Sequence, residues 1–371
     1  MRIAFAAGGT AGHLYPALCT AGELRRRDRF FEALFLVSRR GREREVLQQY
    51  GFPCEELPAS GFGGALSLRL VPAAAALLSS YRRARALMKG RGAQALIGYG
   101  AYVSVAPALA ARALGLRVII HEQNAVMGRA NRWLVRLADR VALGLPLSDE
   151  PRWAERGYLL TGIPLRPEVI QGVTREEARR YLGVGPGAFT VLVMGGSQGA
   201  RAINGMMAEG SGLLARGGDL QVVHLSGSGD YASVVGAYAR AGLRAVVVPY
   251  LREMEWAYAA ADLAVCRSGA MTLAELAQSG IPAILIPYPH AVGNHQAANG
   301  RLFETSGAAL LRDESGLTAG GLAEIILSLK RDAAALGKMS AAARSLASPR
   351  AAQRLADLIE ETVGTTVTSC S

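Results

Sequence analysis

The stretch RSGAMTLAELAQSGIPAILIPYPHAVGNHQAAN, residues 267–299, decides the fold class of this chain. The apolar run Leu263–Cys266 directly before it predicts a buried parallel strand, and a helix is expected to begin near Ala270. A second apolar strand, Pro282–Ile286, leads into a polar segment that ends at Asn299. Strand, loop, helix and strand in this order are typical of a parallel α/β sheet covered by helices.

The loop inside this stretch has the residues of an anion pocket. Gly269 lets the backbone approach a ligand closely, and the start of the following helix offers N–H groups that have no partner within the helix. Arg267 adds a planar fork of donors, and Glu275 provides a carboxylate that can accept hydrogen bonds from sugar hydroxyls. A sugar nucleotide is therefore the expected ligand, while the alternative is an ordinary strand–loop–helix turn capped by Ser268.

The alternation of apolar strand and amphipathic helix runs through the whole chain and predicts parallel sheets with both faces covered. Strands are expected near Ile3–Ala6, Leu34–Val37, Ala95–Gly98, Val118–Ile120 and Val141–Leu143, and again near Thr190–Met194, Gln221–Leu225, Ala245–Val248, Leu263–Cys266 and Ala283–Ile286. Between the two sets lies TGIPLRP (161–167), whose prolines cannot continue a helix and predict a hinge. We expect two doubly wound, Rossmann-like α/β domains facing across a cleft, residues 1–162 and 163–345. A C-terminal helix and tail, 346–371, should pack back on the first domain.

The composition excludes several classes of protein. The four cysteines are scattered, which argues against a disulfide framework and for a reducing compartment. The five histidines lack zinc-ligand spacing and no D-x-D pair is present to hold Mg²⁺, so we expect no metal and no cofactor. The apolar part of the N-terminus is too short for a signal peptide, and no apolar run reaches the roughly 18 residues that span a bilayer. We therefore expect a cytoplasmic location.

The whole net charge of +11 falls within residues 1–165. This half is expected to face something anionic: nucleic acid, acidic lipid or a phosphorylated substrate. Nucleic acid is disfavoured because basic and aromatic residues are not interleaved. In the segment Leu66–Arg91, apolar residues at helical spacing (Leu70, Ala74, Leu77, Leu78, Tyr81) precede the basic residues Arg82, Arg83, Arg85, Lys89 and Arg91. We expect this helix to dock on an anionic membrane; the alternative is a surface helix with a solvated basic end.

Further polar loops follow the other predicted strands, where ligands of open α/β sheets bind. The loop GGTAGH (8–13) is not G-x-G-x-x-G, and no acidic residue ends the second strand, so a nicotinamide cofactor is disfavoured. His13 in this loop is a candidate general base, or else a capping or packing histidine. The sequence HEQN (121–124) indicates a ligand-lined cleft or a buried polar network, and GGSQGAR (195–201) suits phosphate or ribose.

In this order, GGTAGH, YVS, HEQN, GGSQGAR, CRSGAMTLAEL and NHQAAN resemble the motifs of the MurG family, over residues 2 to about 345. That family transfers N-acetylglucosamine (GlcNAc) from UDP-GlcNAc to undecaprenyl-pyrophosphoryl-MurNAc-pentapeptide (lipid I), which gives lipid II. The resemblance implies the GT-B fold, inversion at the anomeric carbon, and a peripheral position on the cytoplasmic face of the inner membrane. It implies UDP-GlcNAc, lipid I and the anionic membrane surface as partners, without nucleic acid.

The resemblance also implies roles for individual residues. His13 matches the family's candidate base, and Tyr102, His121 and Glu122 line the acceptor side; we take His13, Glu122 and Tyr102 as catalytic candidates. Substrate-binding positions are matched by Thr10, Ala11, Gly12, His121, Asn124, Arg166, Ser197, Leu251, Arg267, Ala270, Met271, Thr272, Leu273, Ala274, Glu275 and Gln296. Three residues depart from the family's pattern: Ala11 and Ala101 replace glycine, and Ile163 replaces asparagine. None removes a chemically active group.

Three other readings remain open. Another GT-B enzyme, acting on diacylglycerol or a natural product, would share the fold, but HEQN together with NHQAAN argues against it. A UDP-sugar epimerase would share the fold too, and would act on the donor without any lipid. A nucleotide-binding module without catalysis is disfavoured because polar groups cluster on both sides of the expected cleft.

Overall fold

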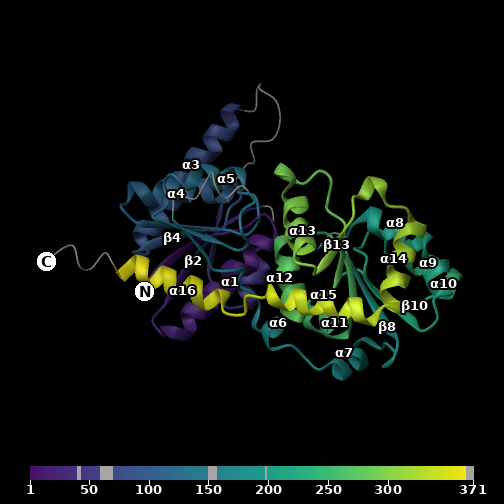
Figure 1. Cartoon of the computed structure of the whole chain (residues 1–371). Coiled ribbons are helices and arrows are strands. Elements are labelled where there is room, and N and C mark those ends of the chain that lie inside the picture. Colours follow the sequence, from purple (N-terminus) through teal and green to yellow (C-terminus); the bar gives the residue numbers. More distant parts are fainter. Residues whose placement is uncertain (40–42, 59–69, 149–156, 197–198, 365–371) are drawn as a thin grey trace. The chain divides into compact units, whose positions relative to one another are not determined.

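A computed structural model describes residues 1–39, 43–58, 70–148, 157–196 and 199–364 of the chain. The chain forms two compact units, which are described separately (Figure 1). The first unit consists of Met1–Arg166 together with the segment that starts at Ser348, and the second is Pro167–Ala347.

Within the described residues, the first unit is built on a seven-stranded parallel sheet of order β3-β2-β1-β4-β5-β6-β7. Its strands are β1 (Arg2–Ala6), β2 (Glu32–Ser38), β3 (Cys54–Leu57), β4 (Ala95–Gly98), β5 (Arg117–Glu122), β6 (Arg140–Leu143) and β7 (Tyr158–Leu160). Its helices are α1 (Ala11–Arg27), α2 (Glu43–Gln49), α3 (Leu70–Gly90), the 3₁₀ turn η1 (Tyr102–Ser104), α4 (Val105–Ala113), α5 (Arg129–Leu134) and α16 (Ala351–Gly364).

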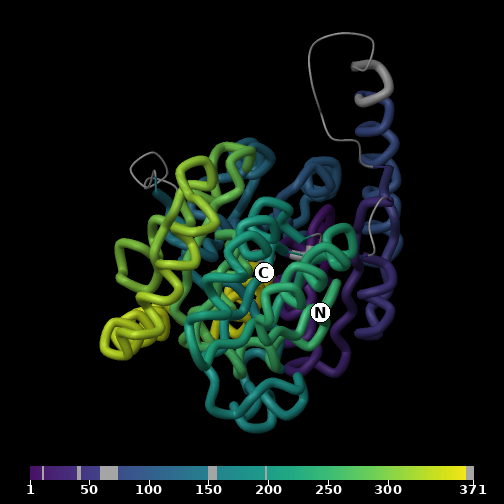
Figure 2. Tube along the Cα trace, turned by 90° about the vertical axis from the view of Figure 1, so that its right-hand side faces the viewer, coloured from purple at the N-terminus to yellow at the C-terminus, as the bar shows by residue number. Residues whose placement is uncertain are grey.

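Alternate residues of each strand enter opposite cores, because successive side chains of a strand point to opposite faces. Ile3 and Phe5 of β1 pack in one core with α1 and α16, whereas Ala4 and Ala6 pack in the other with α3 and α4. The helix α16 lies against α1 and adds Leu355 and Ile359 to the first core (Figure 1). The long helix α3 lies at the edge of this unit (Figure 2).

The second unit holds, among its described residues, a six-stranded parallel sheet of order β10-β9-β8-β11-β12-β13. The strands are β8 (Phe189–Met194), β9 (Leu220–Leu225), β10 (Arg244–Val248), β11 (Leu263–Cys266), β12 (Ala283–Leu285) and β13 (Ala309–Leu311). The helices are α6 (Pro167–Gln171), α7 (Arg175–Leu182), α8 (Arg201–Glu209), α9 (Ser211–Ala215), α10 (Tyr231–Ala241), α11 (Met254–Ala260), α12 (Ala270–Ser279), α13 (His295–Thr305), α14 (Ala319–Arg331) and α15 (Ala333–Ser345), with short turns η4 (Val292–Asn294) and η5 (Glu314–Gly316).

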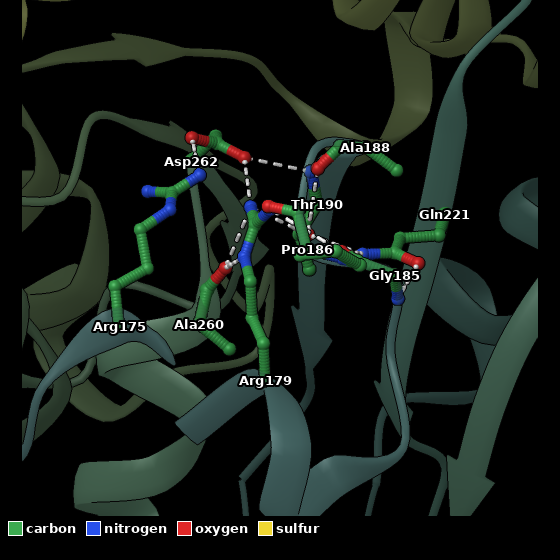
Figure 3. A network of polar contacts seen from close by, with 9 residues as sticks. All are labelled: Arg175, Arg179, Gly185, Pro186, Ala188, Thr190, Gln221, Ala260 and Asp262. Atoms are coloured by element: carbon green, nitrogen blue, oxygen red, sulfur yellow. Dashed lines mark hydrogen bonds and ion pairs between the residues drawn. The ribbon is translucent and has the colours of Figure 1, made fainter. Parts of the chain in front are cut away.

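A buried arginine ties together the amino ends of the strands in this second sheet (Figure 3). Arg179 of α7 is 3% exposed and donates to Asp262 Oδ2 at 3.0 Å and to Thr190 Oγ1 at 3.0 Å. The backbone N–H of Thr190 donates to the same Asp262 oxygen at 2.8 Å. Thr190 belongs to β8 and Asp262 directly precedes β11. The strand pair that carries the loops described below is therefore fixed at its opposite end.

The order of the strands reverses at β1/β4 in the first sheet and at β8/β11 in the second. At such a reversal the connecting helices leave on opposite faces, so that the loops at the carboxyl ends of the two strands border a crevice. The glycine-containing loops predicted to carry chemistry follow these four strands.

Candidate functional site

Two glycine loops of the first unit lie next to each other at the reversal between β1 and β4. The chain leaving β4 is held to β1 by a hydrogen bond from Tyr99 N to Ala6 O at 3.0 Å. A Cβ atom placed on Gly9 would lie 4.0 Å from Ala101 Cβ, so the two loops are close. This arrangement brings the predicted GGTAGH and YVS motifs together on one edge of the first sheet.

His13 is positioned by the residue that begins its own helix. Thr10 precedes α1 with extended backbone, and its hydroxyl makes no cap to the helix but lies 2.9 Å from His13 Nδ1. When Nδ1–H donates to this hydroxyl, Nε2 keeps the lone pair that a general base needs. His13 Nε2 lies 3.6 Å from where a Cβ on Gly100 would be, so this nitrogen points at the second glycine loop.

Ala101 occupies a backbone conformation that normally requires glycine. Its φ is 57° and its ψ is 170°. The departure from the family's glycine, noted from the sequence, therefore stores strain directly before Tyr102, which is 38% exposed. A non-glycine residue held in this region costs about 1–3 kcal/mol.

We expect Ala101→Gly to raise the free energy of unfolding by roughly 1 kcal/mol, because relief of strain outweighs the greater freedom of glycine in the unfolded chain. Denaturant unfolding measures the change. Ala86→Gly, at an exposed position of helix α3, is the control and should lower stability by about 0.5–1 kcal/mol. If both variants lose stability equally, Ala101 is not strained.

The HEQN segment forms a buried network rather than a ligand-lined surface at its first three residues. β5 continues through His121 and Glu122, and the exposed fractions of His121, Glu122 and Gln123 are 0%, 2% and 3%. Gln123 Nε2 donates to His121 Nδ1 at 2.9 Å, which leaves His121 Nε2–H to donate to Gly162 O at 3.2 Å. Burial lowers the pKa of His121 to about 4, so the ring is neutral at physiological pH. His121 thus connects Gln123 to the backbone at Gly162.

Glu122 has its carboxylate occupied by protein donors. Oε1 accepts from the backbone N–H of Asn124 at 3.0 Å and from its Nδ2 at 3.1 Å. Oε2 accepts from Gly128 N and Asn131 Nδ2, each at 2.8 Å. With four donors on its two oxygens, the carboxylate organises the loop 123–128. This geometry favours a positioning role over proton transfer.

Two residues that the sequence reasoning missed belong to this edge. Asn131 is 1% exposed, and its side-chain oxygen lies 3.7 Å from a Cβ placed on Gly100, beside His13. Glu43 is 5% exposed and its Oε1 accepts from Gly9 N at 2.7 Å. Neither residue lies in a glycine-rich motif, so the primary sequence carries no signal for them.

Two other predicted positions border the segment between the units. Arg166 is 8% exposed, and its guanidinium carbon lies 5.1 Å from the centre of the Tyr15 ring. Ile163 is 2% exposed and lies against Gly144. An apolar side chain therefore fits the position where the family has asparagine.

In the second unit, Arg267 is engaged by the protein itself. Its Nη1 donates to the carbonyl oxygens of Ile286 and Pro287, each at 3.0 Å, and its Nη2 forms an ion pair with Glu314 Oε2 at 2.6 Å that is not aligned as a hydrogen bond. The side chain is 11% exposed. The predicted fork of donors for a phosphate thus ties β11 to the segment after β12.

Glu275 and Gln296 lie on the two helices that follow these strands. Glu275 of α12 is 7% exposed, and the Tyr258 hydroxyl donates to its Oε2 at 2.6 Å. The side-chain oxygen of Gln296 in α13 accepts from Tyr288 N at 2.9 Å. The backbone carbonyl oxygen of the same residue accepts from the Ser268 hydroxyl at 2.7 Å. These bonds orient the carboxylate of Glu275 and the side-chain amide of Gln296, and the bond from Ser268 ties α13 to the loop before α12. The N–H groups of the first turn of α12 favour an anion.

The remaining predicted positions divide by burial. Ala270 and Leu273 are buried on the inner side of α12, at 6% and 0% exposure, so the Leu273 side chain is a core residue. Gly12, Asn124, Leu251, Met271, Thr272 and Ala274 are partly exposed. Ser197 and the side chain of Ala11 lie outside the described residues.

Neither a metal centre nor a membrane span is found in the part of the chain that the structure describes. There, no group of three or more His, Cys, Asp or Glu side chains is placed to hold a metal ion. The described helices likewise include none with the length and apolar character needed to cross a bilayer.

Comparison with known proteins identifies the family to which the chain is similar. The N-terminal domain of glycosyltransferase family 28 matches residues 3–143, and the C-terminal domain of the same family matches residues 190–358. A UDP-N-acetylglucosamine–N-acetylmuramyl-(pentapeptide) pyrophosphoryl-undecaprenol N-acetylglucosamine transferase from Desulforudis audaxviator is 37% identical, covering 98% of this chain and 99% of the relative. Its namesake from Geobacter sulfurreducens is 39% identical, over 96% and 97% of the two chains.

Solved structures agree in fold. MurG of Acinetobacter baumannii has a TM-score of 0.76 and 29% identity, covering 97% of this chain and 99% of that one. A calicheamicin glycosyltransferase (TM-score 0.71, 15% identity, 100% and 99% covered) and a UDP-N-acetylglucosamine 2-epimerase (0.68, 13%, 98% and 97%) share the fold alone. The predicted fold class, GT-B with two Rossmann-like units, is confirmed.

Proposed function

Because this chain belongs to the MurG family of glycosyltransferases, we propose that it transfers GlcNAc from UDP-GlcNAc to the C4 hydroxyl of the muramyl sugar in lipid I, which yields lipid II and UDP. The observation that carries the proposal is identity of 37–39% over nearly the whole chain to relatives named for this reaction. The epimerase and natural-product enzymes resemble the chain at 13–17% identity, which supports a common fold and no common substrate.

The proposed reaction is an inverting displacement. The acceptor oxygen attacks the anomeric carbon of GlcNAc, its proton passes to His13 Nε2, and the bond from that carbon to the β-phosphate oxygen breaks. The Thr10 hydroxyl 2.9 Å from Nδ1 supports this role, because it can hold the ring in the required tautomer. Glu122 and His121 act indirectly, by fixing the loop that carries Asn124.

UDP leaves with an additional negative charge, which must be stabilised without rearrangement. The start of α12 after Gly269 offers backbone N–H groups for this purpose. Glu275 and Gln296 are proposed to recognise donor hydroxyls, since each is already oriented by a protein hydrogen bond. Arg267 supports this pocket through the backbone it holds.

One assay tests the function. The protein is incubated with radiolabelled UDP-GlcNAc and a short-chain lipid I analogue in the presence of EDTA, and labelled disaccharide-lipid is expected. Donor consumed equally with and without the lipid would indicate an epimerase or hydrolase and would contradict the proposal. A strict requirement for added Mg²⁺ would contradict a mechanism without metal.

We also propose that the first unit docks on the anionic, cytoplasmic face of the membrane. The helices α3, α4 and α5, of which α4 contacts both others, each expose one large apolar residue: Leu78 (48%), Leu109 (39%) and Trp133 (72%). Arg82, Arg83 and Arg85 are exposed on α3, and Arg136 lies 5.8 Å from the Trp133 ring. Apolar residues among cations suit the headgroup region.

The apolar side of α3 is smaller than the sequence indicates. Tyr81 packs against the core and Leu77 is partly buried, so among the described apolar residues named from the sequence only Leu78 and Ala74 are exposed. Leu70 has its side chain outside the described part. Charge on α3, together with Trp133 of α5, therefore supports docking more than the apolar stripe does.

We expect Arg82→Glu, Arg83→Glu and Arg85→Glu together to weaken binding to anionic vesicles on the order of 100-fold, since each cation near an anionic leaflet contributes about 1 kcal/mol. Co-sedimentation with anionic and neutral vesicles measures it. The control reverses Arg216, Arg240 and Lys338, which are exposed residues of the second unit, and should leave binding unchanged. Equal binding of wild type to both vesicle types would rule out docking through charge.

A further inference from the structure

A buried glutamate that forms no ion pair with the described residues lies against the first glycine loop. Glu43 is the first residue of α2, and its side chain is 5% exposed. Its Oε1 accepts from Gly9 N at 2.7 Å and from the Ser38 hydroxyl at 3.3 Å. Three separate segments of the first unit, β2, α2 and the loop after β1, therefore meet at one carboxylate oxygen.

The glycine loop is shaped to receive this carboxylate. A Cβ on Gly8 would lie 3.1 Å from Glu43 Oε1 and 3.3 Å from Ser38 N, which is tighter than side chains normally pack. Gly9 has a φ of 87°, which other residues rarely adopt. The missing side chain at Gly8 leaves room for the carboxylate, and glycine at position 9 allows the backbone conformation in which its N–H donates to Glu43.

The hydrogen bond between Glu43 and Gly9 N is linked to the proposed base, His13, through Thr10. Glu43 fixes residue 9, residue 10 follows it, and the Thr10 hydroxyl lies 2.9 Å from His13 Nδ1. Because Thr10 makes no side-chain cap to α1, its orientation depends on the backbone that precedes it. Glu43 is thus the anchor of a short chain of contacts that ends at the His13 ring.

Stability alone does not account for this residue. Oε2 of Glu43 is buried and has no hydrogen-bond partner among the described residues, and no ion pair to Glu43 occurs there. Burying a polar group with an unsatisfied oxygen costs free energy, so the presence of this side chain indicates a role other than stability. An apolar side chain here would leave no buried carboxylate oxygen without a partner, but it would not hold Gly9.

We propose that Glu43 is a positioning residue for the transfer reaction, which sets the Gly9–Thr10 backbone and, through Thr10, the orientation of His13. The proposal rests on the proposed function for its kinetic consequence, but its structural part does not. Glu43 touches no reacting atom in this scheme. Its loss should lower turnover and leave the donor pocket of the second unit intact.

The test compares Glu43→Ala, Glu43→Gln and Glu43→Asp with a matched control, Glu45→Ala, which removes an exposed carboxylate from the same helix. For Glu43→Ala, kcat is expected to fall roughly 10- to 100-fold, because a displacement of about 1 Å at a catalytic group has effects of this size. UDP-GlcNAc affinity by calorimetry should fall much less than kcat, since Glu275 and Gln296 of the second unit are untouched and only the loop at Thr10 is displaced.

Two conservative variants separate positioning from mere folding. The amide oxygen of Glu43→Gln can still accept from Gly9 N–H, so kcat should stay within about threefold of wild type. The carboxylate of Glu43→Asp is one methylene shorter and should behave like Ala while keeping the charge. Wild-type turnover in Glu43→Asp, or equal losses in Glu43→Gln and Glu43→Ala, would overturn the proposal even if the alanine variant folds poorly.

A second measurement is independent of activity. Hydrogen exchange at the Gly9 amide, followed by NMR, should be slow in wild type and in Glu43→Gln, and faster in Glu43→Ala and Glu43→Asp. Unchanged exchange in Glu43→Ala would refute the anchoring of Gly9. If wild type formed no disaccharide, the proposed function would fail, while the exchange comparison would still decide whether Glu43 sets the loop.

Discussion

His13→Ala is expected to lower kcat for GlcNAc transfer about 10²- to 10⁴-fold, while the affinity for UDP-GlcNAc stays nearly unchanged. The physical reason is that a general base interacts with the acceptor proton only as the new bond forms. The ring is well placed for this, with Thr10 on Nδ1 and with Nε2 facing the Gly100 loop. Single-turnover kinetics and calorimetry measure the two quantities separately.

The neighbouring candidates provide the contrast. His121→Ala and Glu122→Ala should lose activity together with loop order, because both side chains are buried and bonded within the protein. Their losses should therefore be accompanied by a lower melting temperature, unlike that of His13→Ala. A loss of only a few-fold in His13→Ala would transfer the role of base to water or to another group.

Glu275→Ala is expected to weaken UDP-GlcNAc binding by about 1–3 kcal/mol, the usual contribution of hydrogen bonds to a charged partner. The carboxylate is pre-oriented by the Tyr258 hydroxyl at 2.6 Å, so little freedom is lost when a ligand hydroxyl binds. Titration calorimetry on the folded variant measures the change.

Two further variants serve as controls for this measurement. Glu324→Ala removes an exposed glutamate from α14 in the same unit and should leave the affinity unchanged. Tyr258→Phe keeps the ring and removes the hydroxyl that holds Glu275, so a smaller loss is expected. Unaltered affinity in a folded Glu275→Ala protein would show that the donor site has been assigned to the wrong residues.

The sheets could be predicted from sequence where a strand is buried on both faces, because such a strand is a continuous apolar run. β4 and β11 have the predicted bounds, Ala95–Gly98 and Leu263–Cys266. Three of the four edge strands, β3, β7 and β13, were not predicted, whereas the apolar edge strand β10 was. β3 (Cys-Glu-Glu-Leu) is half polar, and β7 and β13 have only three residues each, so neither length nor composition distinguishes them from loops.

The site was predictable only in its loops. Glycines after strands are visible in a sequence, but the partner of a polar side chain is not. HEQN has the composition of a ligand-lined cleft, and only the fold reveals that Gly128 and Asn131 both donate to Oε2 of Glu122. Glu43 meets Gly9 across 34 residues of sequence. Such long-range pairing depends on how β1 and β2 align.

Because α16 packs in the first unit, it affects the order in which the two units can fold during synthesis. Leu355 and Ile359 are fully buried in the same core as Phe5 and Phe35, more than 300 residues earlier in the chain. Domains usually fold during synthesis in the order in which they emerge, the N-terminal one first. Here the first unit cannot close this core until α16 has been synthesised, so the second unit can finish folding before the first.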